Sequence, residues 1–143
     1  MVDERGAPLS IVISGANTHD VKLLAATLDG IVAERPSEGQ PQQNLCLDAG
    51  YVGEPAKREI EERGYVPHVR PRGEEIAEMD KNPEFKARRW VVEVCHSWFN
   101  RFRKLLVRYE KMDRSYLGLL MLAASVIVLR KIKRKDQGNI IYG

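Results

Sequence analysis

Residues 88–93 read Arg-Arg-Trp-Val-Val-Glu, and residues 98–103 read Trp-Phe-Asn-Arg-Phe-Arg. This stretch places one carboxylate, that of Glu93, in an apolar, helix-compatible run and surrounds it with arginines and aromatic residues. A lone acid in such a setting is either a core carboxylate with satisfied hydrogen bonds or a metal ligand beside a polyanion. The make-up of the whole stretch favours the metal ligand.

Two long helices are predicted around and after this stretch. Apolar residues recur at helical spacing over residues 85–111 and again over residues 116–133. The apolar run 117–129 contains Gly118 and Ser125, and it is shorter than the roughly 20 residues that cross a bilayer. We therefore expect a buried helix here and no contact with a membrane.

Short strands alternate with helices upstream of the stretch. A turn at residues 3–6 precedes a predicted strand at 8–14, and residues 17–20 offer capping groups for a helix at 21–33. The later elements follow in the same manner: a loop at 36–41, a strand at 44–48, a helix at 54–63 closed by Gly64, a strand at 65–69 and a charged loop at 70–83. This alternation predicts an α/β fold.

Length, composition and charge agree with a single globular domain. The chain has 143 residues, of which 43% are hydrophobic and 30% charged, with a net charge of +3. We expect one domain over residues 1–135 and a tail over 136–143. Basic residues concentrate in 86–111 and 130–135, which suits a phosphate backbone; a solvated helix face remains the alternative.

The cysteines and the N-terminus indicate the compartment. Cys46 and Cys95 lack the spacing of a zinc site or a disulfide framework, and no signal-peptide pattern is present. We expect a reduced, cytoplasmic protein.

Asp48 is the second candidate metal ligand. It ends a predicted strand just before a glycine-containing turn, and functional groups in α/β sheets gather at the carboxyl ends of strands. If Glu93 packs against that sheet, the two acids could bind Mg²⁺ and support two-metal phosphodiester chemistry. From spacing alone, the turn or capping role of Asp48 is favoured over the metal role.

The aromatic residues of the stretch have two interpretations. Trp90, Phe99 and Phe102 stand at helical spacing and are expected in the core. Trp98 fits either the core or a surface on which nucleic-acid bases stack.

Three segments resemble one known family. Residues 14–20 (Ser-Gly-Ala-Asn-Thr-His-Asp), residues 47–51 (Leu-Asp-Ala-Gly-Tyr) and Arg89-x-x-x-Glu93 are similar, in this order, to segments of bacterial insertion-sequence DDE transposases with the Tyr-Arg-Glu-Lys signature. The resemblance implies an RNase H-like fold that cleaves and transfers DNA strands at transposon ends with Mg²⁺, or Mn²⁺ in its place. It also implies that Asp48 and Glu93 are the second and third members of the catalytic triad.

The same resemblance implies a DNA-binding surface near Glu93. Arg89 would steer a DNA phosphate or position Glu93. The signature lysine, seven residues after Glu93, falls on Asn100 here, with Arg101 beside it. The residues expected to bind DNA are Arg88, Arg89, Trp98, Arg101, Arg103 and Lys104.

The first catalytic Asp of the family lies on the first strand of the sheet, upstream of the turn at residues 3–6. Asp3 is interpreted as a turn residue and not as its substitute. We therefore expect a partial RNase H-like fold that lacks the first strands and is inactive alone. Such a chain is either poorly stable or completed by an upstream-encoded polypeptide, and we expect an oligomer because unpaired strand edges invite association. The alternatives are a non-catalytic DNA-binding or assembly remnant, and an unrelated basic α/β interaction domain.

Overall fold

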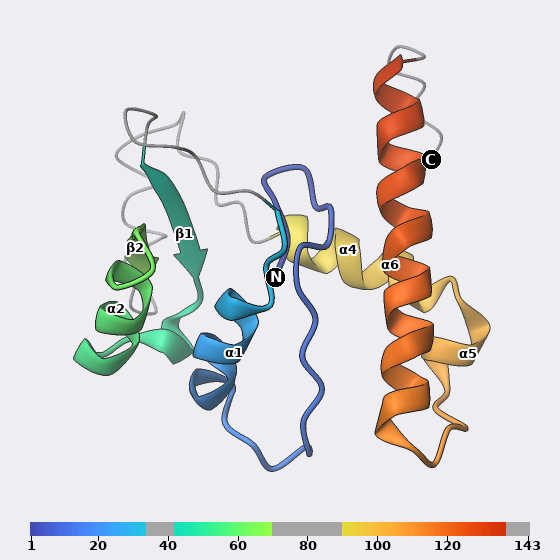
Figure 1. Cartoon of the computed structure of the whole chain (residues 1–143), viewed down its shortest axis with the longest axis horizontal. Coiled ribbons are helices and arrows are strands. Elements are labelled where there is room, and N and C mark those ends of the chain that lie inside the picture. The colour runs from blue at the N-terminus through green and yellow to red at the C-terminus, as the bar shows by residue number, and fades with distance from the viewer. Residues whose placement is uncertain (34–41, 70–89, 137–143) are drawn as a thin grey trace. The chain divides into compact units, whose positions relative to one another are not determined.

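The computed structural model describes residues 1–33, 42–69 and 90–136 (Figure 1). The chain divides into two compact units. One, here called the sheet unit, is Ser14–Arg89, and the other, here called the helical unit, combines Met1–Ile13 with Trp90–Gly143. The predicted loops at 36–41 and 70–83 and the tail beyond residue 136 lie outside the described residues.

The sheet unit contains a strand–helix–strand motif. Strand β1 (Gln43–Leu47) leads through α2 (Glu54–Glu61) to β2 (Tyr65–Val69), and the two strands pair in parallel, with Gln43 opposite Tyr65 and Leu47 opposite Val69 (Figure 1). A helix is the usual connection between parallel strands because they need a long crossover. The predictions for these three elements are confirmed to within two residues at each end. The mixed α/β class is confirmed as well, whereas the RNase H-like topology stays a prediction.

Helix α2 is amphipathic and packs through one face. Ala56 and Ile60, four residues apart, are buried, and Ile60 is fully inaccessible. Gly64 follows with φ +77°, a conformation that glycine adopts at little cost, and it ends the helical segment as predicted. The buried apolar residues of this unit are Leu24, Leu28, Leu45, Ala56 and Ile60.

The first helix is shorter than predicted. A 3-10 turn, η1 (Asp20–Leu23), leads into α1 (Leu24–Asp29), and the structure leaves residues 30–33 outside any helix. Gly30 follows the last helical residue and is unfavourable in a helix interior. The expected side-chain cap is also wrong, because His19 occupies the N-cap without a capping hydrogen bond.

The N-terminal turn of the helical unit is held by Asp3. Its Oδ1 accepts hydrogen bonds from the backbone N–H groups of Arg5 at 2.9 Å and Ala7 at 2.7 Å, which confirms its interpretation as a turn residue. The predicted strand at residues 8–14 is wrong. Within the described residues, only an isolated bridge between Val2 and Pro8 forms there, and a strand without a neighbour to pair with has no ladder.

The predicted helix at 85–111 is also wrong in its described part. It is divided into α4 (Trp90–Asn100) and α5 (Arg103–Leu106). Asn100, a weak helix former, ends α4, and Phe102 adopts an extended conformation between the two helices.

Helix α6 (Asp113–Asp136) is the longest element, and it includes the predicted helix at 116–133 (Figure 1). The expectation that it is buried is wrong for most of its surface, since only 11% of its most apolar window lies inside the structure. Residues 113–133 are long and apolar enough to cross a membrane by length and composition alone, which is weak support for a membrane helix. The absence of membrane contact stays a prediction.

Candidate catalytic and DNA-binding residues

Asp48 stands directly after β1, at the carboxyl end of the strand. It is the N-cap of the short 3-10 turn η2 (Ala49–Tyr51), and its Oδ1 accepts a hydrogen bond from the Gly50 N–H at 2.9 Å. The side chain is exposed, and among the described residues its second carboxylate oxygen has no hydrogen-bond partner. Asp48 is thus a capping residue, and it keeps an oxygen that a metal ion could bind.

Tyr51 connects Asp48 with a residue that the sequence did not single out as a site residue. The pKa of the Tyr51 phenol is raised by burial and then by the negative charges of Asp20 and Asp48. Asp20 begins η1, which lies against η2 in the sheet unit. The only signal for Asp20 in the sequence was its place in the family-like segment 14–20, where a helix-capping role was expected.

Glu93 lies in the first turn of α4 and is exposed. The opposite side of this helix is buried through Val91 and Cys95, and burial raises the pKa of the Cys95 thiol. Because Glu93 is exposed, it is not a core carboxylate. Ser97 and Asn100 follow it at four and seven residues, so they share its face of the helix, and both are exposed.

The described residues contain no preformed metal cluster. No three His, Cys, Asp or Glu side chains gather within residues 1–33, 42–69 and 90–136. Asp48 belongs to the sheet unit and Glu93 to the helical unit. Their convergence on one ion stays a prediction, although two accessible carboxylates are the ligand type that Mg²⁺ prefers.

Basic residues follow Glu93 along the chain. Arg101, between α4 and α5, and Arg103 and Lys104, in α5, are all exposed. None of the three forms an ion pair within the described part of the chain, so their charges are available to a polyanion. Arg88 and Arg89, the other predicted DNA contacts, lie outside the described residues.

Trp98 has a partner within the helical unit. The ammonium group of Lys131 lies 4.1 Å from the centre of its ring, within the range of a cation–π interaction. Trp98 is half-buried, and a cation already covers one of its faces. This geometry favours packing over base stacking, which were the two interpretations left open by the sequence.

Comparison with known proteins gives the family. A family model for the transposase DDE domain matches residues 45–130, which is more than half of the chain. The chain belongs to the DDE transposases of insertion sequences. The matched residues of this transposase chain run from β1 to the C-terminal part of α6, and they include Asp48, Glu93 and the exposed basic residues after α4.

One curated relative of the transposase chain comes from Burkholderia cepacia. It carries the name of a transposase for insertion sequence element IS402, and it is 31% identical over 140 residues. The alignment covers 96% of this chain and 64% of the relative, so the chain spans less than two thirds of that protein's length. No solved structure matches the chain.

Proposed function

We propose that this chain takes part in DNA transposition as the C-terminal part of an RNase H-like catalytic domain, in which Asp48 and Glu93 are two of three metal-binding carboxylates. The position of Asp48 carries the proposal. It combines the carboxyl end of a parallel strand, where α/β proteins hold their ligands, with a carboxylate oxygen that has no partner among the described residues.

The donor chemistry fits a hard divalent ion. Both carboxylates are exposed, and neither forms an ion pair within the described residues that would compete with a metal ion. Bound Mg²⁺ or Mn²⁺ would activate the attacking oxygen and stabilise the leaving oxygen of a phosphodiester. The Gly50 N–H fixes one oxygen of Asp48 and thereby orients the other.

The DNA of the transposon end is held, in this proposal, by the basic residues that follow Glu93. Arg101, Arg103 and Lys104 supply phosphate contacts next to the helix that carries Glu93, and Arg88 and Arg89 precede it in the sequence. Such contacts give position and affinity but not sequence specificity.

The third carboxylate is proposed to lie outside these 143 residues, in the same protein or in an upstream-encoded polypeptide, within an assembly of more than one chain. The turn role of Asp3 removes the N-terminal acid that could have replaced it. The chain alone would then bind DNA without cutting it.

The cytoplasm is the proposed compartment. Cys46 is exposed and Cys95 is buried, and both are free thiols. An accessible free thiol such as Cys46 persists in a compartment that keeps thiols reduced.

A nicking assay on element-end DNA with Mg²⁺ or Mn²⁺ tests the catalytic proposal. The chain would be assayed alone and with the upstream-encoded polypeptide, each as wild type and as the Asp48→Ala and Glu93→Ala variants. We expect nicking only in the mixture, and a loss of at least about a hundredfold in each variant, since even the residues that only support a metal ligand contribute about 10–100-fold.

Glu54→Ala is the matched control. Like Glu93, Glu54 is an exposed glutamate in the first turn of a helix, but it lies outside the proposed centre. Nicking that survives in the Asp48→Ala or Glu93→Ala mixture would contradict the proposal.

A non-catalytic DNA-binding or assembly protein is the second candidate. Arg101, Arg103 and Lys104 favour it, because they form no ion pair among the described residues and can bind DNA without any metal. DNA binding that persists in EDTA and in Glu93→Ala, together with the absence of nicking in every mixture, would select this function.

A further inference from the structure

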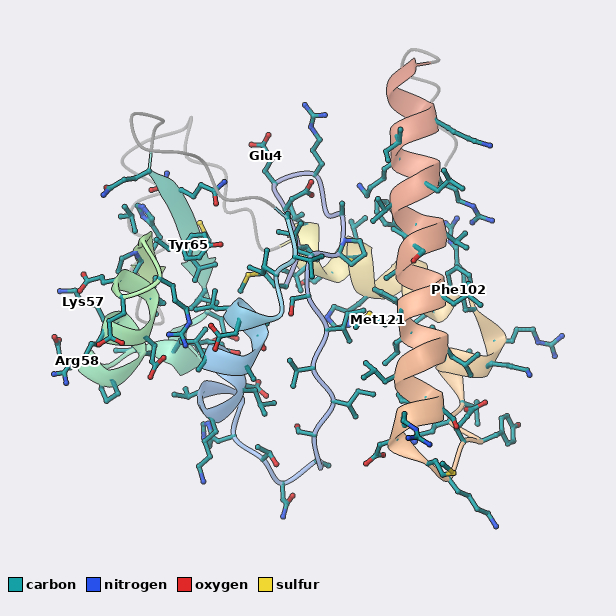
Figure 2. All side chains as sticks on the ribbon, in the orientation of Figure 1. Glu4, Lys57, Arg58, Tyr65, Phe102 and Met121 are labelled. Carbon is teal, nitrogen blue, oxygen red and sulfur yellow. The ribbon has the colours of Figure 1, made fainter. Side chains whose placement is uncertain are left out.

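Helix α6 is apolar on two opposite faces, and the described residues of its own unit bury only one of them. Ala123 and Ile127, four residues apart, are buried on the inner face. The other face, here called the outer face, consists of Gly118, Met121, Leu122, Ser125, Leu129 and Ile132, all of which are exposed. Side chains project from α6 on both sides in Figure 2, where Met121 is labelled.

The outer face is a continuous apolar strip. Leu122, Leu129 and Ile132 keep 64%, 53% and 57% of their surfaces exposed, and no charged residue lies between Arg114 and Arg130. A helix that is apolar all round is normally covered all round, because exposed contiguous apolar surface is unfavourable in water.

The spacing of the outer face is that of a helix-pairing seam. Residues 118, 122, 125, 129 and 132 alternate steps of four and three, which is the heptad pattern of helices that pack side by side. Ser125 fits such an interface, since its hydroxyl donates to the Met121 carbonyl at 2.9 Å and stays satisfied when water leaves.

We propose that the outer face of α6 binds the same face of a second copy of this chain, with the two helices antiparallel. The strip is self-complementary in this direction. With Ser125 near the two-fold axis, the large Ile132 of one copy faces Gly118 of the other, and Leu129 faces Met121 and Leu122. An isologous contact of this kind closes on itself as a dimer. The strip from residue 118 to 132 is about 21 Å long.

The charges of the helix support the antiparallel direction. Arg130 and Lys133 are exposed near the carboxyl end of the strip. A parallel pair would bring these cations of the two copies side by side, and like charges repel. A parallel pair would also place Gly118 opposite Gly118 and Ser125 opposite Ser125. These small side chains would leave cavities between the layers of large residues.

A second copy fits better than a lipid bilayer. Residues 113–133 are long and apolar enough to cross a membrane by length and composition, but this segment carries charged residues at both ends, Asp113 and Arg114 at one and Arg130, Lys131 and Lys133 at the other. Only the run between Arg114 and Arg130 is uncharged, and it is shorter than the roughly 20 residues of a typical spanning helix. The small residues Gly118 and Ser125 leave depressions in the helix surface. Side chains of a second helix can pack into these depressions, whereas lipid chains gain no specific contact from them.

The Ser125→Glu variant of the full chain tests the dimer in analytical ultracentrifugation. Glu is a better helix former than Ser and Ser125 is already exposed, so the variant is expected to fold. We expect a dimer for the wild type and, because two carboxylates would meet at the axis, a dissociation constant at least about tenfold higher for the variant. Val32→Glu, which adds the same charge at a residue that is 94% exposed in the sheet unit, should leave the dimer intact.

Several results would overturn the proposal. A wild-type chain that stays monomeric up to its solubility limit would do so, as would an undisturbed dimer in Ser125→Glu. A monomer that floats with phosphatidylcholine vesicles would assign the outer face to lipid instead.

Disulfide trapping tests the direction of the helices in a Cys46→Ser background, which removes the exposed native thiol. With an added thiol oxidant such as diamide, the Gly118→Cys/Ile132→Cys double variant and the Ser125→Cys variant should form covalent dimers. Gly118→Cys alone should not. A covalent dimer of Gly118→Cys alone would contradict the antiparallel arrangement.

Discussion

At the residue scale, the surroundings of Tyr51 give a titration that can be measured. Its pKa is raised above the ordinary value of 10.0 by burial, then by Asp20 and then by Asp48. We expect Asp20→Asn to lower the Tyr51 pKa more than Asp48→Asn does, in a pH titration of the tyrosine ring signals by NMR. An unchanged pKa in both variants would contradict the proximity of these three side chains.

The raised pKa also sets the direction of a pH effect on stability. As pH rises, the unfolded chain releases the Tyr51 proton before the folded chain does. The contribution of Tyr51 is therefore complete below about pH 10 and is lost as pH rises through the folded pKa. Thermal unfolding of Tyr51→Phe should show a weaker dependence on alkaline pH than that of the wild type.

Asn100 offers a gain-of-binding test on the face of α4 that carries Glu93. It is exposed and occupies the position where the family signature has a lysine. Asn100→Lys should bind DNA more tightly, and one added phosphate contact should steepen the log–log salt dependence by about 0.9. Asn17→Lys makes the same charge change at an exposed position of the sheet unit and should alter the slope much less. Equal effects of the two substitutions would contradict a DNA surface on α4.

The sequence predicted the role of a residue within its own turn or strand end better than its contacts with residues far away in the chain. The place of Asp48 at a strand end and the turn role of Asp3 follow from neighbouring residues, and the structure has both. The closeness of Asp20 to Tyr51 could not be predicted, because it depends on how η1 and η2 pack. The cover that Lys131 gives to Trp98 likewise joins residues far apart in the chain.

At the scale of the elements, the packing of α2 can be tested at Ile60. Ile60 is fully buried, so Ile60→Ala removes apolar contacts and leaves a cavity. We expect it to lower the free energy of unfolding by about 2–5 kcal/mol, measured by denaturant titration with circular dichroism. Val52→Ala, at a residue that is 55% exposed, should change it by less than about 0.5 kcal/mol. An equal loss of unfolding free energy in Ile60→Ala and Val52→Ala would contradict the packing of α2.

The elements that the sequence predicted best are those with their own start and stop signals. The segment from β1 to β2 has strand-forming runs, a proline in the first turn of α2 and Gly64 after it. The division of α4 from α5 was missed, because continuous helical spacing hides a break that Asn100 and Phe102 make. The strand predicted at residues 8–14 does not form, for another reason: strand formation requires a partner, and periodicity says nothing about partners.

At the scale of the whole molecule, the catalytic proposal joins two units. Family membership rests on a match that extends through both, from residue 45 to residue 130. Each unit holds one of the proposed metal ligands, Asp48 in the sheet unit and Glu93 in the helical unit. The central claim is therefore that these two carboxylates bind the same ion.

Paramagnetic line broadening tests that claim most directly. The isotopically labelled chain, mixed with the unlabelled upstream-encoded polypeptide, would be titrated with Mn²⁺ while NMR follows the amides of Gly50 and Val94. We predict that both amides broaden at the same Mn²⁺ concentration, and that either Asp48→Ala or Glu93→Ala abolishes both effects, while Glu54→Ala abolishes neither. Broadening at one amide that persists after removal of the other unit's carboxylate would contradict a shared metal site.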